Sequence, residues 1–203
     1  IDSNLNKSNL NLERLHGWHK CLFENTQYSK LNKIDISKFR THSDIEVVSG
    51  AIGYEKVHYK AIPVEKIDKN IENFLKYCNE SFENLYIKAA IVHIWFVIIH
   101  PYDDGNVRIA RAITDYILSQ NNSNTQFKLY SISTAINKDR NGYYDILDKT
   151  TNLFLNKNFD LTPWIEWHLN TLNDAMKQSL INIEYFIQKT KFWDKHRSKG
   201  LNE

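Results

Sequence analysis

Proline, glycine and cysteine are scarce in this chain of 203 residues, which has three, six and two of them, respectively. So few helix breakers predict long helices that are joined by short loops. Two cysteines cannot form a disulfide framework, and Cys21 and Cys78 lack the spacing of metal ligands. The cysteine content therefore favours a reducing, cytoplasmic setting.

The chain also lacks an excess of charge of one sign and a long apolar run. Its formal net charge is only +2, which argues against nucleic acid or an anionic membrane as a partner. The longest apolar run, residues 89–99, is interrupted by His93 and is shorter than the ~20 residues that a membrane span needs. No signal peptide is evident at the start. Because the chain does not begin with methionine, we expect it to be a fragment of a longer polypeptide.

The overall composition is that of a globular protein, with 42% hydrophobic and 25% charged residues. The length of the chain suits one domain. We expect that domain over residues 10–195. Residues 1–9, which are rich in Asn, Ser and Lys, should form a loose terminus. Residues 196–203 should form a tail or the start of a further region.

Apolar periodicity and cap signals predict six helical stretches. They cover residues 10–23, 63–79, 85–99, 104–120, 138–155 and 162–195, the last as one helix or a helix pair. Residues 85–99 are apolar around most of the circumference, so this helix should lie at the centre of the fold and end before Pro101. We expect Thr162 to be the N-cap of the last helix, because Pro163 suits the first helical position.

Residues 46–62 have a different pattern, in which β-branched and aromatic residues bracket Gly50 and Gly53. This pattern predicts a β-hairpin whose turn uses the conformational freedom of glycine. A polar loop is expected between the first helix and about residue 35. The expected fold class is therefore all-α, mainly helical around a central buried helix, with one β-hairpin.

The segment at residues 100–111 reads His-Pro-Tyr-Asp-Asp-Gly-Asn-Val-Arg-Ile-Ala-Arg and concentrates groups that suit phosphoryl-type chemistry. His100 would lie at the end of the buried helix, and the free pKa of histidine, ~6.5, suits a general base near neutrality. Asp104 offers a hard oxygen ligand, and Mg²⁺ typically takes only one or two protein carboxylates. The N–H groups of Gly105 and Asn106 would precede a helix, whose dipole favours an anion there.

Arg108 and Arg111 are three residues apart, so they would share one helical face and could both contact a polyphosphate. The structural alternative is two surface ion pairs at a spacing of four residues, Asp104 with Arg108 and Arg111 with Asp115. His93, in the apolar run, is expected to be a hydrogen-bonded core histidine.

The same segment resembles the signature of the Fic family, His-Pro-Phe-x-Asp/Glu-Gly-Asn-Gly-Arg-x-x-Arg, and eleven of its twelve positions are compatible. Tyr102 replaces the phenylalanine, and its hydroxyl would need a hydrogen-bond partner if buried. Asp103 occupies the free position, and Val107 stands where the second glycine is expected. Residues 47–59 resemble the hairpin flap that precedes the motif in that family, and residues 15–23 resemble its early helix.

The resemblance implies a Fic fold and a protein adenylyltransferase, which transfers AMP from ATP to a Ser, Thr or Tyr hydroxyl of a target protein. By this resemblance His100 is the catalytic base, and Asp104 holds the Mg²⁺ that bridges the phosphates. Asn106 is expected to contact phosphate directly. The implied nucleotide- and phosphate-binding residues are Gly105, Asn106, Val107, Arg108 and Arg111.

The flap, by the same resemblance, would hold a target segment by adding a strand to it, which uses main-chain hydrogen bonds and tolerates varied sequences. Its expected docking residues are Ser49, Gly50, Ala51, Ile52, Gly53, Tyr54, Glu55, Lys56 and Val57.

Many Fic proteins are inhibited by a helix with the pattern Ser/Thr-x-x-x-Glu-Gly/Asn, and this sequence has no instance of it. Glu24 comes nearest, but Lys20 occupies the Ser/Thr position. We therefore expect the inhibitory helix upstream of Ile1 or on a separate antitoxin-like partner.

Val107 leaves two outcomes open. If the position requires a positive φ, a β-branched residue costs about 1–3 kcal/mol there and could crowd the phosphates. If the backbone is helical, valine costs only helix propensity, roughly a few tenths of a kcal/mol.

The alternatives to adenylylation are a non-catalytic nucleotide-binding module and a transferase that uses another nucleotide or a phosphocholine donor. A DNA-binding regulator is a weaker alternative, because the chain shows no basic recognition helix.

Overall fold

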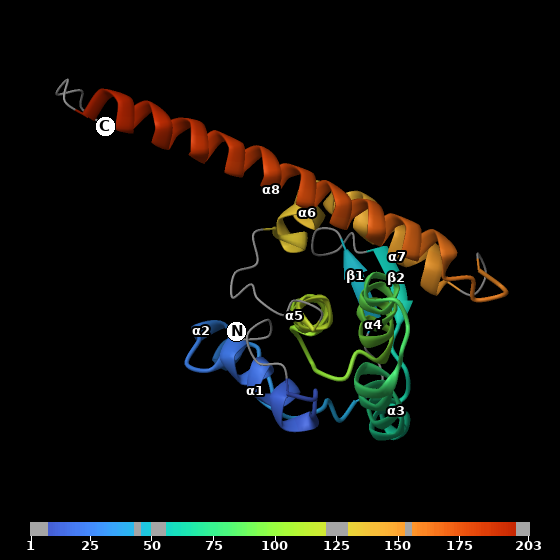
Figure 1. Cartoon of the computed structure of the whole chain (residues 1–203). Coiled ribbons are helices and arrows are strands. Elements are labelled where there is room, and N and C mark those ends of the chain that lie inside the picture. Colours follow the sequence, from blue (N-terminus) through green and yellow to red (C-terminus); the bar gives the residue numbers. More distant parts are fainter. Residues whose placement is uncertain (1–7, 43–45, 50–55, 121–129, 153–155, 198–203) are drawn as a thin grey trace.

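The computed structural model describes residues 8–42, 46–49, 56–120, 130–152 and 156–197, and this part of the chain is mainly helical (Figure 1). Its first half contains α1 (Leu12–Phe23), α2 (Gln27–Leu31), β1 (Glu46–Ser49), β2 (Lys56–Lys60), a short 3₁₀ turn η1 (Val64–Lys66) and α3 (Ile67–Glu80). Its second half contains α4 (Leu85–Ile99), α5 (Asn106–Ser119), α6 (Ile132–Lys138), α7 (Arg140–Thr151) and α8 (Thr162–His196).

Each of the six predicted helical ranges contains a helix, and α8 is one continuous helix rather than a pair. The prediction of a polar loop through residue 35 is wrong, because α2 forms there and Thr26 caps it by accepting a hydrogen bond from the N–H of Ser29. Thr162 is not the N-cap of α8. Leu161 holds that position, and the N–H of Thr162 donates to the Asp160 carboxylate instead.

The strands β1 and β2 pair in an antiparallel two-stranded sheet, with Glu46 opposite Lys60 and Ser49 opposite Lys56. The register is irregular between Val47 and Val48. Residues 50–55, which make up most of the expected docking flap, lie outside the described residues. The docking role of the flap therefore stays a prediction.

Helix α4 is the centre of the fold, and it contacts α3, α5 and α8. Nine of its fifteen residues are buried, which agrees with its nearly uniform apolar sequence. Asn84 caps its start by accepting a hydrogen bond from the N–H of Tyr86. His100 follows its other end, so the central helix of the core positions the predicted base.

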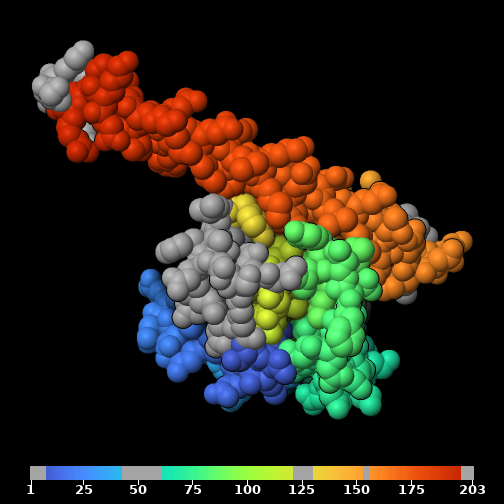
Figure 2. Space-filling view, viewed as in Figure 1, coloured from blue at the N-terminus to red at the C-terminus, as the bar shows by residue number. Residues whose placement is uncertain are grey.

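Helix α8 runs across one end of this helical group, and its C-terminal part extends away from it (Figures 1 and 2). Its buried residues, Trp164, His168, Leu172, Ala175 and Ser179, all lie in the first half of the helix. None of the helices in the described part of the chain combines the length and apolar character that a bilayer crossing requires.

Candidate active site

His100 is the C-cap of α4, where the chain turns out of the helix. Its backbone is left-handed, with φ 48° and ψ 58°, and its N–H still donates to the carbonyl of Phe96. The ring Nδ1 lies 3.3 Å from the carbonyl oxygen of Val97. Because a carbonyl can only accept, this contact requires the proton on Nδ1, which leaves Nε2 with a free lone pair.

The environment of His100 shifts its ionisation. The residue is only 9% exposed, and burial lowers its pKa to about 4, although the carbonyl of Val97 acts in the opposite direction. The free value of ~6.5 therefore does not apply to His100 in the folded chain, because burial removes the imidazole from water, and the sequence alone does not reveal this desolvation. At neutral pH the imidazole is uncharged, so its Nε2 is able to accept a proton.

Gly105 is the N-cap of α5, and two features of the position require glycine. Its φ is +83°, a conformation that L side chains rarely adopt. A Cβ at this position would also lie 2.8 Å from Cε2 of Phe23, which is too close. The N–H of Gly105 donates to Oδ1 of Asp104, so the loop is closed immediately before the helix begins.

The first turn of α5 presents backbone donors that no carbonyl of the helix can satisfy. The first backbone bond into the helix runs from the N–H of Ile109 to the carbonyl of Gly105, at 2.9 Å. The N–H groups of Asn106, Val107 and Arg108 precede it, so no carbonyl within the helix can accept from them. Three such donors at the positive end of a helix form an anion-binding position.

The side chain of Asn106 shapes the loop. Its Oδ1 accepts from the N–H of Tyr102 at 3.0 Å, and its Nδ2 donates to the carbonyl of Tyr102 at 2.8 Å. The residue is 2% exposed. Because both ends of the amide are used in this way, the group that Asn106 offers to a phosphate is its backbone N–H.

Val107 lies in the first turn of α5, so its backbone is helical, and it is not among the described residues with positive φ. Of the two outcomes that the sequence left open, the structure has the helical one, in which valine causes no backbone strain and costs only helix propensity. The side chain lines the cavity and also packs on the core. Valine is thus compatible with the N–H arrangement that the motif glycine would supply.

We therefore expect Val107→Gly to leave the Kd for ATP within roughly twofold of the wild-type value. The same change should lower the free energy of unfolding by about 1 kcal/mol, because glycine weakens the helix and removes packed methyl groups. Isothermal titration calorimetry and urea denaturation measure the two quantities. ATP binding that becomes tenfold tighter in the variant would show that the valine side chain crowds the phosphates.

Asp104 and Arg108 form the ion pair that the structural alternative predicted, with Arg108 Nη2 3.7 Å from Asp104 Oδ1. Both side chains are about 40% exposed, and exposed pairs of this kind contribute little. The Arg108 guanidinium also lies over the ring of Phe23, 4.7 Å from its centre. The hydroxyl of Tyr28 hydrogen-bonds to Asp104, which raises the pKa of Tyr28. Asp104 is thus accessible to solvent, and Gly105, Arg108 and Tyr28 share its carboxylate.

One cavity of about 430 Å³ joins these groups. Every non-flap residue of the predicted site lines it: His100, Asp104, Gly105, Asn106, Val107, Arg108 and Arg111. Arg140 and Tyr144 of α7 line it too, with the Arg140 guanidinium 5.8 Å from the centre of the Tyr144 ring. No local pattern in the sequence indicated Arg140, which adds a third arginine to the lining. A larger groove of about 770 Å³ between α6 and α8 contains none of the motif residues.

The donor set suits a magnesium ion that arrives with a nucleotide. The described residues contain no group of three or more His, Cys, Asp or Glu side chains that could hold a metal ion alone. Mg²⁺ usually takes one or two carboxylates and fills its other positions with water and phosphate oxygens. Asp104 meets that requirement at the cavity. Asp103 also lines the cavity, but its carboxylate accepts from the N–H of Asp35 and lies 3.8 Å from Nδ1 of His42.

Two expectations for buried polar side chains are confirmed. The hydroxyl of Tyr102 lies 3.0 Å from Nδ1 of His16, so the polar atom that replaces phenylalanine has a partner. His93 is fully buried, with Thr114 Oγ1 3.1 Å and the Tyr143 hydroxyl 3.3 Å from its ring nitrogens. Both residues therefore serve the core beneath the cavity.

The comparison with protein families finds the Fic/DOC family over residues 9–118. No curated protein sequence matches the chain. Among solved structures, a Fic family protein from Desulfovibrio desulfuricans superposes with a TM-score of 0.64 at 21% identity, covering 89% of this chain and 51% of the other. A Fic domain containing signaling protein from Bacteroides thetaiotaomicron gives 0.64 at 18% identity, covering 89% and 64%.

Fic-1 from C. elegans (its residues 134–508) gives a TM-score of 0.59 at 15% identity, covering 87% of this chain and 44% of the other. This chain thus spans between 44% and 64% of the length of these three proteins. At such identities the superpositions show a shared fold, and the family assignment comes from the match over residues 9–118. The chain belongs to the Fic/DOC family.

Proposed function

We propose that this chain transfers AMP from ATP to a hydroxyl group of a target protein. Proteins of its family generally transfer a nucleotide monophosphate to other proteins. The observation that carries the proposal is one cavity lined by the uncharged base His100, the N-terminus of α5 and three arginines. A base, an anion-binding helix end and cations are the groups that phosphoryl-type transfer needs.

In the proposed reaction the target hydroxyl oxygen bonds to the α-phosphorus of ATP as its proton passes to Nε2 of His100. The bond from the α-phosphorus to the bridging oxygen breaks, and pyrophosphate leaves. The free N–H groups at the start of α5, with Arg108 and Arg111, stabilise the negative charge of the leaving group. Asp104 would hold a Mg²⁺ that arrives with the nucleotide, and the ion would neutralise further charge on the phosphates.

The low pKa of His100 is compatible with this role, because the ligand changes the electrostatics of the cavity. Without nucleotide, burial is the largest cause that lowers the pKa of His100, and the charge of Arg40 adds to it. A bound polyphosphate brings negative charge close to the imidazole, which favours the protonated form and raises its pKa toward neutrality. The base would thus strengthen when its substrate is present.

The strands β1 and β2 are the proposed docking site, which would bring the target hydroxyl to His100. A target segment would add as a strand along the flap, and docking of this kind relies on main-chain hydrogen bonds. Arg40 ties the residues that flank the two strands, His42 and Ile62, to the end of α4. The resemblance to the Fic family implies that the glutamate of the inhibitory helix pairs with the second motif arginine, and we therefore propose that such a helix, when present, binds at Arg111.

The position of the label in ATP tests the reaction. When the chain is incubated with Mg²⁺, a cell lysate and ATP labelled at the α-phosphate, we expect label on protein bands. ATP labelled at the γ-phosphate should give none, because the β- and γ-phosphates leave as pyrophosphate. Transfer of the γ-label would identify a kinase reaction and overturn the proposal. Binding of ATP with no transfer of either label would favour a nucleotide-binding module.

A further inference from the structure

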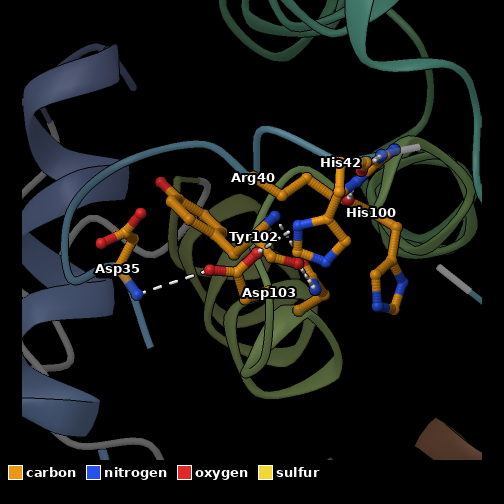
Figure 3. A network of polar contacts seen from close by, with 7 residues as sticks. Asp35, Arg40, His42, His100, Tyr102 and Asp103 are labelled. Atoms are coloured by element: carbon orange, nitrogen blue, oxygen red, sulfur yellow. Dashed lines mark hydrogen bonds and ion pairs between the residues drawn. The ribbon is translucent and has the colours of Figure 1, made fainter. Parts of the chain in front are cut away.

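Arg40, in the segment between α2 and β1, is a buried arginine outside the motif. Its exposed fraction is only 2%. Its Nε donates to the carbonyl of His100 at 2.7 Å, and its Nη1 donates to the carbonyl of His42 at 2.7 Å. Its Nη2 donates to the carbonyl of Ile62, and its own backbone N–H donates to the carbonyl of Pro101 at 2.9 Å. Figure 3 shows Arg40 beside His42 and His100 in this polar network.

These four bonds join three segments that are distant in the sequence. His100 and Pro101 form the turn at the end of α4. His42 precedes β1, and Ile62 follows β2, so both lie at the base of the two-stranded sheet. One side chain therefore connects the predicted base to both ends of the predicted flap.

The choice of arginine has a geometric reason. A guanidinium is a planar group with donors at fixed angles, whereas an ammonium is a compact charge on a flexible stem. Burying a charge is costly unless it is well hydrogen-bonded, and the three carbonyls offset that cost. The last carbonyls of a helix also lack intrahelical partners, and the turn that follows α4 obtains partners from Arg40.

The turn itself needs such support. The left-handed backbone of His100 is unfavourable for a residue with a Cβ, so it persists only where other contacts fix it. The same backbone places Nδ1 against the carbonyl of Val97 and leaves Nε2 free. A change at this turn would therefore alter the direction of the ring.

We infer that Arg40 is a positioning residue, which holds His100 in the turn that presents Nε2 and fixes the base of the β1–β2 sheet relative to it. The catalytic part of this inference rests on the proposed function. Arg40 does not line the cavity with the motif residues. Replacement of Arg40 should therefore change the position of His100 Nε2 relative to the target hydroxyl. ATP binding should remain intact.

The test compares Arg40→Met and Arg40→Lys with Lys88→Met. Lys88 is a matched control, because it is a buried cation on α4, the helix that ends at His100, and its Nζ donates to the carbonyl of Ser81 at 3.0 Å. It lies at the opposite end of α4, away from the site. Arg40→Lys keeps the charge and most of the packing, and so it carries the test if Arg40→Met does not fold.

Two measurements are made on each folded variant. The first is the tautomer of His100 from ¹⁵N NMR of the ring nitrogens, which requires no activity. We expect the Nδ1–H form in the wild type and in Lys88→Met, and a mixture of tautomers in the Arg40 variants. The second is the kinetics of α-label transfer to a target found in the labelling experiment. We expect kcat to fall about 100-fold in Arg40→Met and less in Arg40→Lys.

The Kd for ATP should stay within roughly twofold of the wild-type value in all three variants, which separates positioning from nucleotide binding. Arg40 variants with the wild-type tautomer and a kcat equal to that of Lys88→Met would overturn the inference. If the wild type transfers no label, the proposed function fails on its own. The NMR comparison then still decides whether Arg40 holds His100.

Discussion

Replacement of His100 by asparagine should reduce α-label transfer by about 10²–10⁴-fold, the usual contribution of a general base. Asparagine cannot accept the proton in the same way, yet it tolerates the left-handed backbone that this position has. The variant thus removes the proposed chemistry and keeps the turn. The Kd for ATP should change little, because the N–H groups of α5 and the arginines remain.

His42→Asn is the matched control for this experiment. The imidazole of His42 is also near the site, but it is largely exposed and its charged neighbour is Asp103. We expect transfer by this variant to stay close to the wild-type rate. Equal losses in the two variants, or label transfer that survives the change at His100, would rule out His100 as the base.

Acid should destabilise the chain steeply between pH 6.5 and pH 4, because several histidines are buried in their neutral form. Burial lowers the pKa of His100 and of His168 to about 4, and it lowers the pKa of His93 well below the usual value. In the unfolded chain these side chains bind protons near ~6.5, so stability is complete above that pH and is lost as the pH falls toward 4.

The size of the effect follows from linkage. By pH 5, His100 and His168 should each remove about 2 kcal/mol from the free energy of unfolding. Two such losses form a large part of the roughly 5–15 kcal/mol that stabilises an ordinary domain. Urea denaturation at a series of pH values measures this loss directly.

His168→Phe isolates one of the contributions. His168 is fully buried against Trp164 and His93, and neither of its ring nitrogens has a hydrogen-bond partner in the described part of the chain. A phenyl ring fills a similar space without titrating. We expect the variant to match or exceed wild-type stability at pH 7.5 and to lose about 2 kcal/mol less by pH 5. An unchanged pH dependence would show that His168 does not titrate in this range.

Features with a strong local signal were predictable from the sequence. The apolar run before Pro101 predicted α4 with its correct ends, and the motif predicted seven residues that line one cavity. The short helices α2 and α6 were missed, because five and seven residues are too few for a periodic pattern. Their only signals are the capping side chains of Thr26 and Ser131, and such residues also occur in many loops.

Other features depend on the tertiary structure. Arg40 and Arg140 reach the site through contacts with distant segments, and no spacing in the sequence relates them to His100. The conformation at Val107 depends on where α5 begins, which the sequence placed two residues too early. The low pKa of His100 arises from burial by several helices together. Each of these requires the packed structure, which local patterns do not determine.

The contact between Gly105 and Phe23 means that the phosphate-binding loop and the end of α1 cannot diverge independently. Residue 105 cannot gain a side chain while a ring stands 2.8 Å from where its Cβ would lie. Residue 23 cannot lose its ring without also removing the surface on which Arg108 rests. The two positions, far apart in the chain, therefore form one unit of evolutionary constraint, and substitutions at residue 23 are expected to be accepted only together with changes that preserve the shape of the loop.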